Sequence, residues 1–287
     1  MAMTPYSGDT SIIGKLGTTP QERGLTTQQF KDKFDEGLKA FVEWFNETHI
    51  AEANTYLNPT MHRTIFRGKN LGTSLTTAQR TAIQNGTFED LWLGDYWVIN
   101  GITWRIVDID YWYNCGDIAF TNHHLVIMPD HVLYYAQMNA TGTTEGGYIG
   151  SLMYTEGLSQ AKTLVTSAFG DAVLTHREYL VNAVTDGKPS GGAWFDSSVE
   201  LPNEIMMYGS YVFTPAADGQ FITNRHTIGN SQLALMQQVP RFIKPRQDYW
   251  LRDVVSAVEF ANVAYGGIPS HYGASHSLGV RPVFPIG

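Results

Sequence analysis

Apolar residues recur with the period of a helix near the start of the chain. Between residues 25 and 49 they stand three or four positions apart, at Phe30, Phe34, Leu38, Phe41, Val42 and Phe45. This spacing places them on one helix face and leaves charged residues on the others. Thr26, followed three residues later by Gln29, has the pattern of a capping box at a helix start. We predict an amphipathic helix of about twenty residues in this segment.

The segments on either side of this helix have no hydrophobic period. Residues 1–24 predict an extended arm, and the Asn-Pro pair within residues 54–61 predicts a linker. We therefore expect an arm and helix over residues 1–57 and a globular domain over residues 62–287. The apolar stripe either packs on its own domain or serves oligomerisation and attachment, and its loop-like flanks favour the second interpretation. The residues expected to serve oligomerisation or attachment are Phe30, Phe34, Leu38, Phe41 and Phe45.

The clearest β signal surrounds Asn100-Gly101. This dipeptide favours the two positive-φ positions of a type I′ turn, and runs of aromatic and β-branched residues flank it. Side chains alternate between the two faces of a strand, so Trp97 and Trp104 share a face. We predict a β-hairpin whose tryptophan-bearing face is buried, with Trp104 as a structural residue.

Shorter patterns predict the remaining elements. We expect helices near residues 74–88, 130–139, 155–171 and 174–187, the last with Thr175 and Glu178 as its capping box. We expect strands at residues 123–129, 249–251, 254–258 and 280–284, and long loops over residues 186–232. The predicted class is α+β, preceded by an N-terminal arm and an amphipathic helix.

Two arginines interrupt apolar runs near the end of the sequence. Arg252 follows the structural tryptophan Trp250, and Arg281 lies in a Gly-Val-Arg-Pro block. A guanidinium on a largely buried strand requires carboxylate or carbonyl partners, and Asp253 and Asp108 are the candidates for pairing. We interpret both arginines as structural, with an ion pair joining the C-terminal strand to the sheet. Direct contact with a ligand is the alternative.

Composition narrows the functional classes. Of the 287 residues 43% are hydrophobic and 13% aromatic, but only 16% are charged, so the predicted surface is polar and largely uncharged. Such surfaces are common in extracellular and virion proteins and in carbohydrate binders. The net charge of −8, with no Lys/Arg run longer than two residues, argues against nucleic-acid binding. The single cysteine, Cys115, excludes an intramolecular disulfide and is expected to pack as a small apolar residue.

Targeting signals are not visible in the sequence. The N-terminal ten residues lack the basic and apolar regions of a signal peptide, and no apolar run is long enough to span a bilayer. We therefore expect synthesis in a cytoplasm and no insertion into a membrane.

Patterns that carry chemistry are sparse. Adjacent side chains on a strand point to opposite faces, so His123 and His124 are not expected to share a metal. The sequence contains no nucleophile elbow, phosphate-binding loop or dinucleotide fingerprint. Paired acids at positions 108 and 110 and at positions 200 and 204 are no more than chance predicts. We expect no catalytic residue, no metal, no cofactor and no enzymatic activity.

Three segments resemble a family of phage and prophage proteins of Gram-positive hosts: residues 95–112, 174–213 and 249–287. Those proteins share a C-terminal WLR…GVRP module, which here comprises residues 250–252 and 279–282. The module is similar to the C-type-lectin-like fold, in which a tryptophan-bearing strand and a terminal arginine strand complete one sheet. The resemblance implies a mixed or antiparallel sheet with short helices and long loops. Val280 lies at the position where the terminal strand of that fold usually has phenylalanine. The sulfatase-modifying enzymes also use this fold, but their catalytic cysteines have no counterpart near the C-terminal residues of this chain.

Residues 12–47 separately resemble the attachment segments of phage minor structural proteins, in which an amphipathic helix follows a Thr-x-x-Glu-Arg-Gly-Leu-Thr stretch. The two resemblances together imply a virion structural protein of tail-fibre, head-fibre or receptor-binding type. It would be made in the host cytoplasm, join other virion proteins in the particle and form a homo-oligomer, expected to be a trimer. A purely architectural decoration or collar protein and a cell-wall hydrolase are the alternatives.

Carbohydrate on the host surface is the expected ligand of such a protein. A sugar ring stacks on Tyr or Trp, while Asp and His take its hydroxyl groups. The candidate ligand-binding residues lie in the loop-rich second half of the chain: Trp194, Asp196, Tyr265, His271, Tyr272 and His276.

Overall fold

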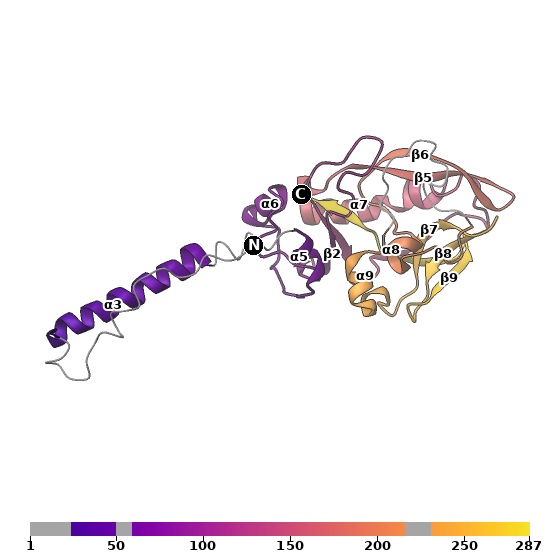
Figure 1. Ribbon diagram of the computed structural model, residues 1–287. Helices are drawn as coiled ribbons and strands as arrows, with labels where there is room; N and C mark the ends of the chain where they lie inside the picture. The colour runs from indigo at the N-terminus through magenta and orange to yellow at the C-terminus, as the bar shows by residue number, and fades with distance from the viewer. Residues whose placement is uncertain (1–23, 50–58, 216–230) are drawn as a thin grey trace. The chain divides into compact units, whose positions relative to one another are not determined.

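The computed structural model describes residues 24–49, 59–215 and 231–287. The chain divides into two units, Met1–Asn58 and Pro59–Gly287. Nearly all of the predicted arm, and the predicted linker as far as residue 58, lie outside the described residues. Within the described ranges the structure is mixed α/β, with several antiparallel sheets and few helices (Figure 1). No helix in those ranges is long and apolar enough to cross a bilayer.

The first unit contains the predicted amphipathic helix, α3 (Thr27–Trp44), which continues into one π-helical turn, η1 (Phe45–His49). Thr26 caps the helix: its side chain accepts from the backbone N–H of Gln29, and the Gln29 side chain accepts from the backbone N–H of Thr26. The prediction of a capping box is confirmed. No residue of α3 is buried.

The second unit is built around two larger sheets and a two-stranded ribbon. The four-stranded sheet has the order β1 (Tyr96–Ile99), β2 (Ile102–Ile109), β3 (Leu125–Pro129), β11 (Phe284–Ile286), and all its pairs are antiparallel. The five-stranded sheet has the order β4 (Tyr134–Gln137), β10 (Ser277–Val280), β7 (Tyr249–Val254), β8 (Glu259–Val263), β9 (Pro269–Gly273), with one parallel pair, β7 and β10. The ribbon pairs β5 (His176–Thr185) with β6 (Lys188–Ser197).

The tryptophan hairpin forms as predicted. Asn100 and Gly101 both have positive φ, 53° and 77°, and join β1 to β2. Trp97 pairs with Trp104 across the hairpin, and both indoles are fully buried. The Trp104 ring meets the edge of Phe284 at 5.6 Å, which ties the hairpin to the C-terminal strand.

The four-stranded sheet is covered on both faces. Successive residues of a strand point to opposite sides, and in β3 Ile127 joins one hydrophobic cluster whereas Val126 and Met128 join the other. The first cluster contains the tryptophan hairpin, and the second contains Cys115, which is buried as predicted. The unit therefore has two apolar layers separated by this sheet.

The helices of the second unit are short. They are α5 (Pro59–Thr64), α6 (Thr77–Gln84), α7 (Ser159–Phe169), α8 (Glu204–Tyr208) and α9 (Ala234–Gln238), with shorter turns η2 (Met153–Gly157), η3 (Gly170–Ala172) and η4 (Pro240–Ile243). The predictions of α6 and α7 are confirmed; Thr76 caps α6, and Gly170 follows the last residue of α7.

Two predicted helices are strands. Residues 174–187 were expected to be helical, but His176–Thr185 is β5, because Asp186 and Gly187 take positive φ values of 52° and 71° and close a two-residue hairpin turn to β6. The Thr175–Glu178 pattern is therefore not a capping box. Residues 130–139 were also expected to be helical, but Tyr134–Gln137 form β4, which pairs with β10 and contains two adjacent aromatic residues of the kind that favour strands.

The C-terminal prediction is correct in part. The expected strand 280–284 is two strands, since β10 ends at Val280 in the five-stranded sheet and β11 begins at Phe284 in the sheet of the tryptophan hairpin. The segment that contains Arg281 crosses from one sheet to the other. The expected strand at 254–258 is likewise wrong, because β7 ends at Val254 and a turn precedes β8.

Candidate functional site

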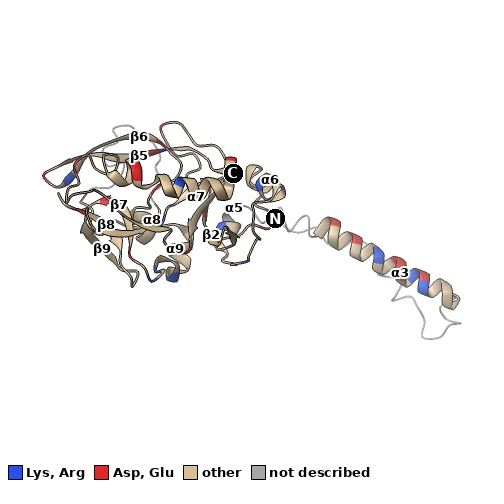
Figure 2. Ribbon diagram, turned by 180° about the vertical axis from the view of Figure 1, so that it is seen from behind, with Lys and Arg blue, Asp and Glu red and all other residues tan. Residues whose placement is uncertain are grey.

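The apolar stripe of α3 lies in solvent within its own unit. Phe34 and Leu38 are 53% and 54% exposed, Phe41 and Phe45 are also exposed, and Phe30 is half-buried. The rings of Phe41 and Phe45 stack on each other with centroids 6.3 Å apart. Figure 2 shows the acidic and basic residues that alternate along the rest of the helix. The five residues predicted for oligomerisation or attachment thus form one exposed apolar surface, which is costly in water unless a partner covers it.

Four of the predicted carbohydrate-binding residues surround β9, the edge strand of the five-stranded sheet. Tyr265 is 60% exposed in the turn that precedes β9, and His271 and Tyr272 lie on the strand. His276 follows β9, and its ring lies 5.0 Å from that of Tyr272. Tyr265 precedes the opposite end of β9 from His276, and a strand of five residues is roughly 13 Å long.

The other two predicted ligand-binding residues lie on a different sheet. Trp194 and Asp196 are on β6 of the two-stranded ribbon. Trp194 packs edge-to-face on Tyr179 at 5.4 Å, and Asp196 accepts a hydrogen bond of 3.0 Å from Arg177. The structure therefore brings Tyr272 and His276 together but does not gather all six residues into one site.

A buried polar cluster joins β5, β7 and the segment after β6. Arg252 donates a hydrogen bond of 2.6 Å to Glu178, and Glu200 accepts one of 2.8 Å from Tyr148. Asp253 and Asp108 were the predicted ion-pair partners of Arg252 and Arg281. In the structure Arg252 pairs with Glu178, and Asp108 pairs with Arg63. The helix predicted at residues 174–187 is the strand β5, and this places Glu178 in the sheet interior rather than at a helix cap.

The two buried carboxyl groups of this cluster differ in charge state. Burial raises the pKa of Glu178, but the positive charge of Arg252 and the nearby His176 more than offset this and lower it to about 2. Burial and the charge of Glu178 raise the pKa of Glu200 to about 7. Such a split is typical of acid–base pairs in enzymes. The side chains here are only 8% and 3% exposed, so solvent has little access to either carboxyl group.

Arg281 has a different set of partners. Its guanidinium donates to the carbonyls of Pro129 and Phe242, at 2.8 and 3.0 Å, and to the hydroxyl of Tyr249 at 3.2 Å. Burial raises the pKa of Tyr249 to about 12, so this hydroxyl is neutral near pH 7. Among the described residues no carboxylate forms an ion pair with Arg281, although the side chain is only 1% exposed. The ion pair expected for this arginine is replaced by carbonyl contacts.

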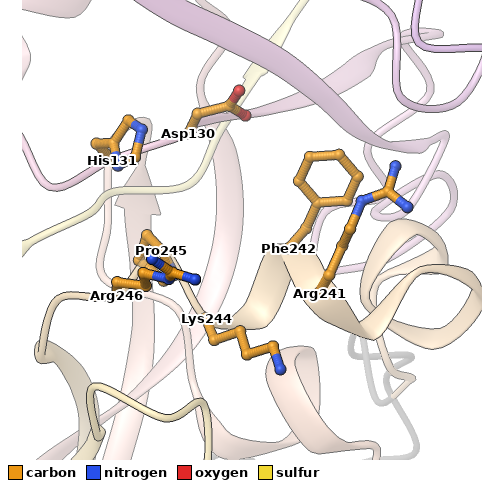
Figure 3. A pocket seen from close by; sticks show the side chains of 7 residues that line it. All are labelled: Asp130, His131, Arg241, Phe242, Lys244, Pro245 and Arg246. Carbon is orange, nitrogen blue, oxygen red and sulfur yellow. The ribbon is translucent and has the colours of Figure 1, made fainter.

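An open depression of about 280 Å³ lies above the Arg281 crossing. Two segments far apart in the sequence line it: the turn between β3 and β4, with Asp130 and His131, and the segment after α9, with Arg241, Phe242, Lys244, Pro245 and Arg246. Figure 3 shows the Arg246 guanidinium directed toward the space beside Phe242, with Arg241 and Lys244 at the rim. Figure 2 shows Lys and Arg positions on the ribbon close to α9.

The basic character of this depression was not predicted. The sequence has no long Lys/Arg run, but residues 240–246 place three cations within seven positions. Counting Lys and Arg within a short window detects this basic segment, whereas counting consecutive Lys and Arg residues does not. Sequence alone does not show that the turn at residues 130–131 folds against it.

Metal-binding residues do not cluster in the described part of the chain. His123 Nδ1 lies 2.8 Å from Asp110 Oδ2, and His124 Nδ1 lies 3.7 Å from Asp110 Oδ1. Within the described ranges no group of three His, Cys, Asp or Glu side chains has the geometry to hold a metal ion. Asp110 therefore contacts the ring of His123 and accepts from the backbone N–H of His124, whereas His124 Nδ1 lies 3.0 Å from the carbonyl of Asn122.

Comparison of the chain with protein-family models, with curated proteins and with solved structures finds no match.

Proposed function

We propose that this chain is a structural protein of a bacteriophage particle, of tail-fibre, head-fibre or receptor-binding type. In this proposal residues 1–57 attach and oligomerise the protein, and the globular unit is presented outward. The observation that carries the proposal is the exposed apolar stripe of α3, which belongs to a different unit from the globular part. An apolar helix face exposed in this way is costly in water unless a partner covers it, and a second copy of the helix or another virion protein provides one.

The spacing of the stripe supports self-association. Phe34, Leu38, Phe41 and Phe45 are separated by four, three and four residues, which is the alternation of a coiled-coil seam. A seam of about two heptads is marginally stable alone, so further contacts within the particle or between globular units are needed. We expect the oligomer to be a trimer.

The globular unit is proposed to have a C-type-lectin-like arrangement. The support is that the tryptophan hairpin and the C-terminal strand β11 belong to one antiparallel sheet. Fold alone does not define the ligand. The exposed Tyr265 and Tyr272 around β9 support contact with the apolar face of a sugar, and His271 and His276 provide polar groups beside them.

Labelling of virus particles tests the proposed function. Antibodies against the globular unit should label particles purified from the host at one defined location, as seen by electron microscopy. Light scattering should find the purified full-length protein as an oligomer. A monomeric protein together with unlabelled particles would contradict the proposal. Labelled particles without any sugar binding would favour a decoration or collar protein.

A further inference from the structure

We propose that the depression between the β3–β4 turn and residues 240–246 binds the anionic group, phosphate or carboxylate, of a carbohydrate polymer. The site is separate from the aromatic residues around β9. It adds a ligand class to the globular unit and does not depend on whether the chain is a virion protein.

The cations that line the depression are not neutralised by the protein. Arg241, Lys244 and Arg246 are all exposed, and among the described residues none of them forms an ion pair with a carboxylate. The one acid of the lining, Asp130, is held by Arg105 through two hydrogen bonds of 2.6 Å. The charge of Asp130 is therefore already compensated, and the lining retains an excess positive charge.

A further positive charge lies directly behind the basic segment. Arg281 donates to the carbonyl of Phe242, and its other recorded partners are a second carbonyl and a neutral hydroxyl. A buried guanidinium without a counter-charge makes the nearby potential positive, because the protein interior screens charge weakly. An anion in the depression would reduce this unfavourable potential, whereas a neutral sugar would not.

The basic segment is held in place before any ligand arrives. Pro240 begins η4 and Pro245 follows it, so two φ angles are fixed. Arg241 packs over the rings of Phe66 and Phe242, at 5.5 and 5.1 Å. Arg246 has a positive φ of 61°, a backbone conformation that is costly for a residue with a side chain. These constraints reduce the conformational entropy lost on binding.

The observations favour a sugar-borne anion over a nucleic acid. Three exposed cations give a footprint smaller than a nucleic-acid backbone usually requires. The ring of Phe242 already lies against the guanidinium groups of Arg105 and Arg241, at 4.6 and 5.1 Å, so it is not available for stacking on a base.

The test measures binding of soluble polymers to the immobilised full-length protein. The probes are poly(glycerol phosphate), polygalacturonate, neutral dextran and a single-stranded DNA oligonucleotide. We expect one or both of the anionic polymers to bind, more weakly as salt is added, and dextran not to bind at this site. The first two probes distinguish phosphate from carboxylate as the source of the anion.

The variant for this test is the double substitution Lys244→Gln and Arg246→Gln, which removes two charges from the rim. It should weaken binding of the anionic polymer by about tenfold or more. Lys188→Gln is the matched control, since Lys188 is exposed on β6 and forms no ion pair with a described residue. Thermal melting should show that both variants fold as the parent does.

Three outcomes would overturn the inference. The first is that neither anionic polymer binds at millimolar repeat-unit concentration. The second is that the double variant binds as tightly as the Lys188→Gln control. The third is that the DNA oligonucleotide binds more tightly than either anionic polymer, which would reassign the depression to nucleic acid. Particle labelling is unaffected by any of these results, so failure here is distinct from failure of the proposed virion role.

Discussion

Arg252 on β7 and Glu178 on β5 form a buried ion pair, with Nη2 and Oε1 2.6 Å apart. The Arg252 guanidinium also lies 3.4 Å from the carbonyl of Leu201. The backbone N–H of Arg252 donates to the carbonyl of Pro202. One arginine therefore connects the five-stranded sheet, the β5–β6 ribbon and the segment that follows the ribbon. The pair fixes how these three parts of the globular unit pack.

Removal of one member of this pair should be severely destabilising. Glu178→Gln removes the negative charge that lies 2.6 Å from the buried Arg252 guanidinium, and we expect the free energy of unfolding to fall by about 3–5 kcal/mol. Urea unfolding at pH 7 measures the change. The double variant Glu178→Leu/Arg252→Met, which removes both charges, should lose less than the sum of its two single variants. A loss below about 1 kcal/mol for Glu178→Gln would contradict a structural role for the pair.

Glu200 should make stability depend on pH above its ordinary titration range. Its pKa is near 7 in the folded protein, above the ordinary value of 4.5, so the folded state retains a proton that the unfolded state releases. Stability should therefore fall as pH rises from about 4.5 to about 7. Glu178 has the opposite shift, and its contribution is lost only as pH falls from 4.5 toward 2.

Glu200→Gln tests this dependence, since Gln still accepts from Tyr148 and does not ionise. Relative to the parent protein, the variant should gain up to about 3 kcal/mol of stability between pH 5 and pH 8. Urea unfolding at both pH values gives the difference. Parallel pH profiles for the two proteins would show that Glu200 is not the responsible group.

Two hairpin glycines provide a matched test of local space. Gly101 and Gly187 both occupy the second position of a two-residue turn, with φ values of 77° and 71°. A Cβ at Gly101 would meet nothing within 4 Å, whereas one at Gly187 would lie 2.8 Å from the backbone nitrogen of Ala257. Gly101→Ala should lose about 1 kcal/mol from φ strain alone, and Gly187→Ala about 1–3 kcal/mol more. Equal losses in thermal melting would mean that the β5–β6 turn does not contact Ala257.

The stripe of α3 should control the oligomeric state. Leu38→Asp places a charge within the apolar surface and should raise the dissociation constant of the oligomer at least about tenfold. Ala40→Asp adds the same charge on another face of the helix and serves as the control. Light scattering over a dilution series distinguishes them. Oligomers of equal stability in both variants would show that α3 does not make the contact.

The aromatic residues around β9 should matter for sugar binding. Tyr265→Ala and Tyr272→Ala each remove a ring that is available to stack on a sugar, and each should weaken binding to host-surface polysaccharide by about tenfold. Tyr135→Ala is the control, because Tyr135 is equally exposed but lies on β4. Glycan-array signals that fall equally in all three variants would reflect a general effect rather than a site.

Local signals in the sequence were sufficient for several elements. Thr26 and Gln29 mark the start of α3, and Asn100-Gly101 marks the tryptophan hairpin, since each depends only on neighbouring residues. The signal for β5 was ambiguous. Thr175 and Glu178 have the spacing of a helix capping box, whereas the Asp186-Gly187 pair is typical of a hairpin turn. The turn at Asp186-Gly187 specifies the hairpin.

The candidate sites depend on contacts between distant segments, which one sequence does not reveal. Glu178 meets Arg252 only because β5 is a strand that packs near β7. The basic depression requires the turn at Asp130 to fold beside residues 241–246. The predicted sugar-binding residues were chosen by residue type, and the structure separates Trp194 from those around β9 because they belong to different sheets.

The pairing of β3 with β11 has a consequence for how the globular unit forms during synthesis. Ile127 pairs with Phe284, so one side of β3 remains without its neighbour until nearly all of the unit has left the ribosome. Contacts so distant along the chain form slowly, and a nascent chain with an uncovered apolar strand is prone to aggregate. We therefore expect chaperone dependence for this unit in the cell, while the helix α3, whose contacts are local, is complete much earlier.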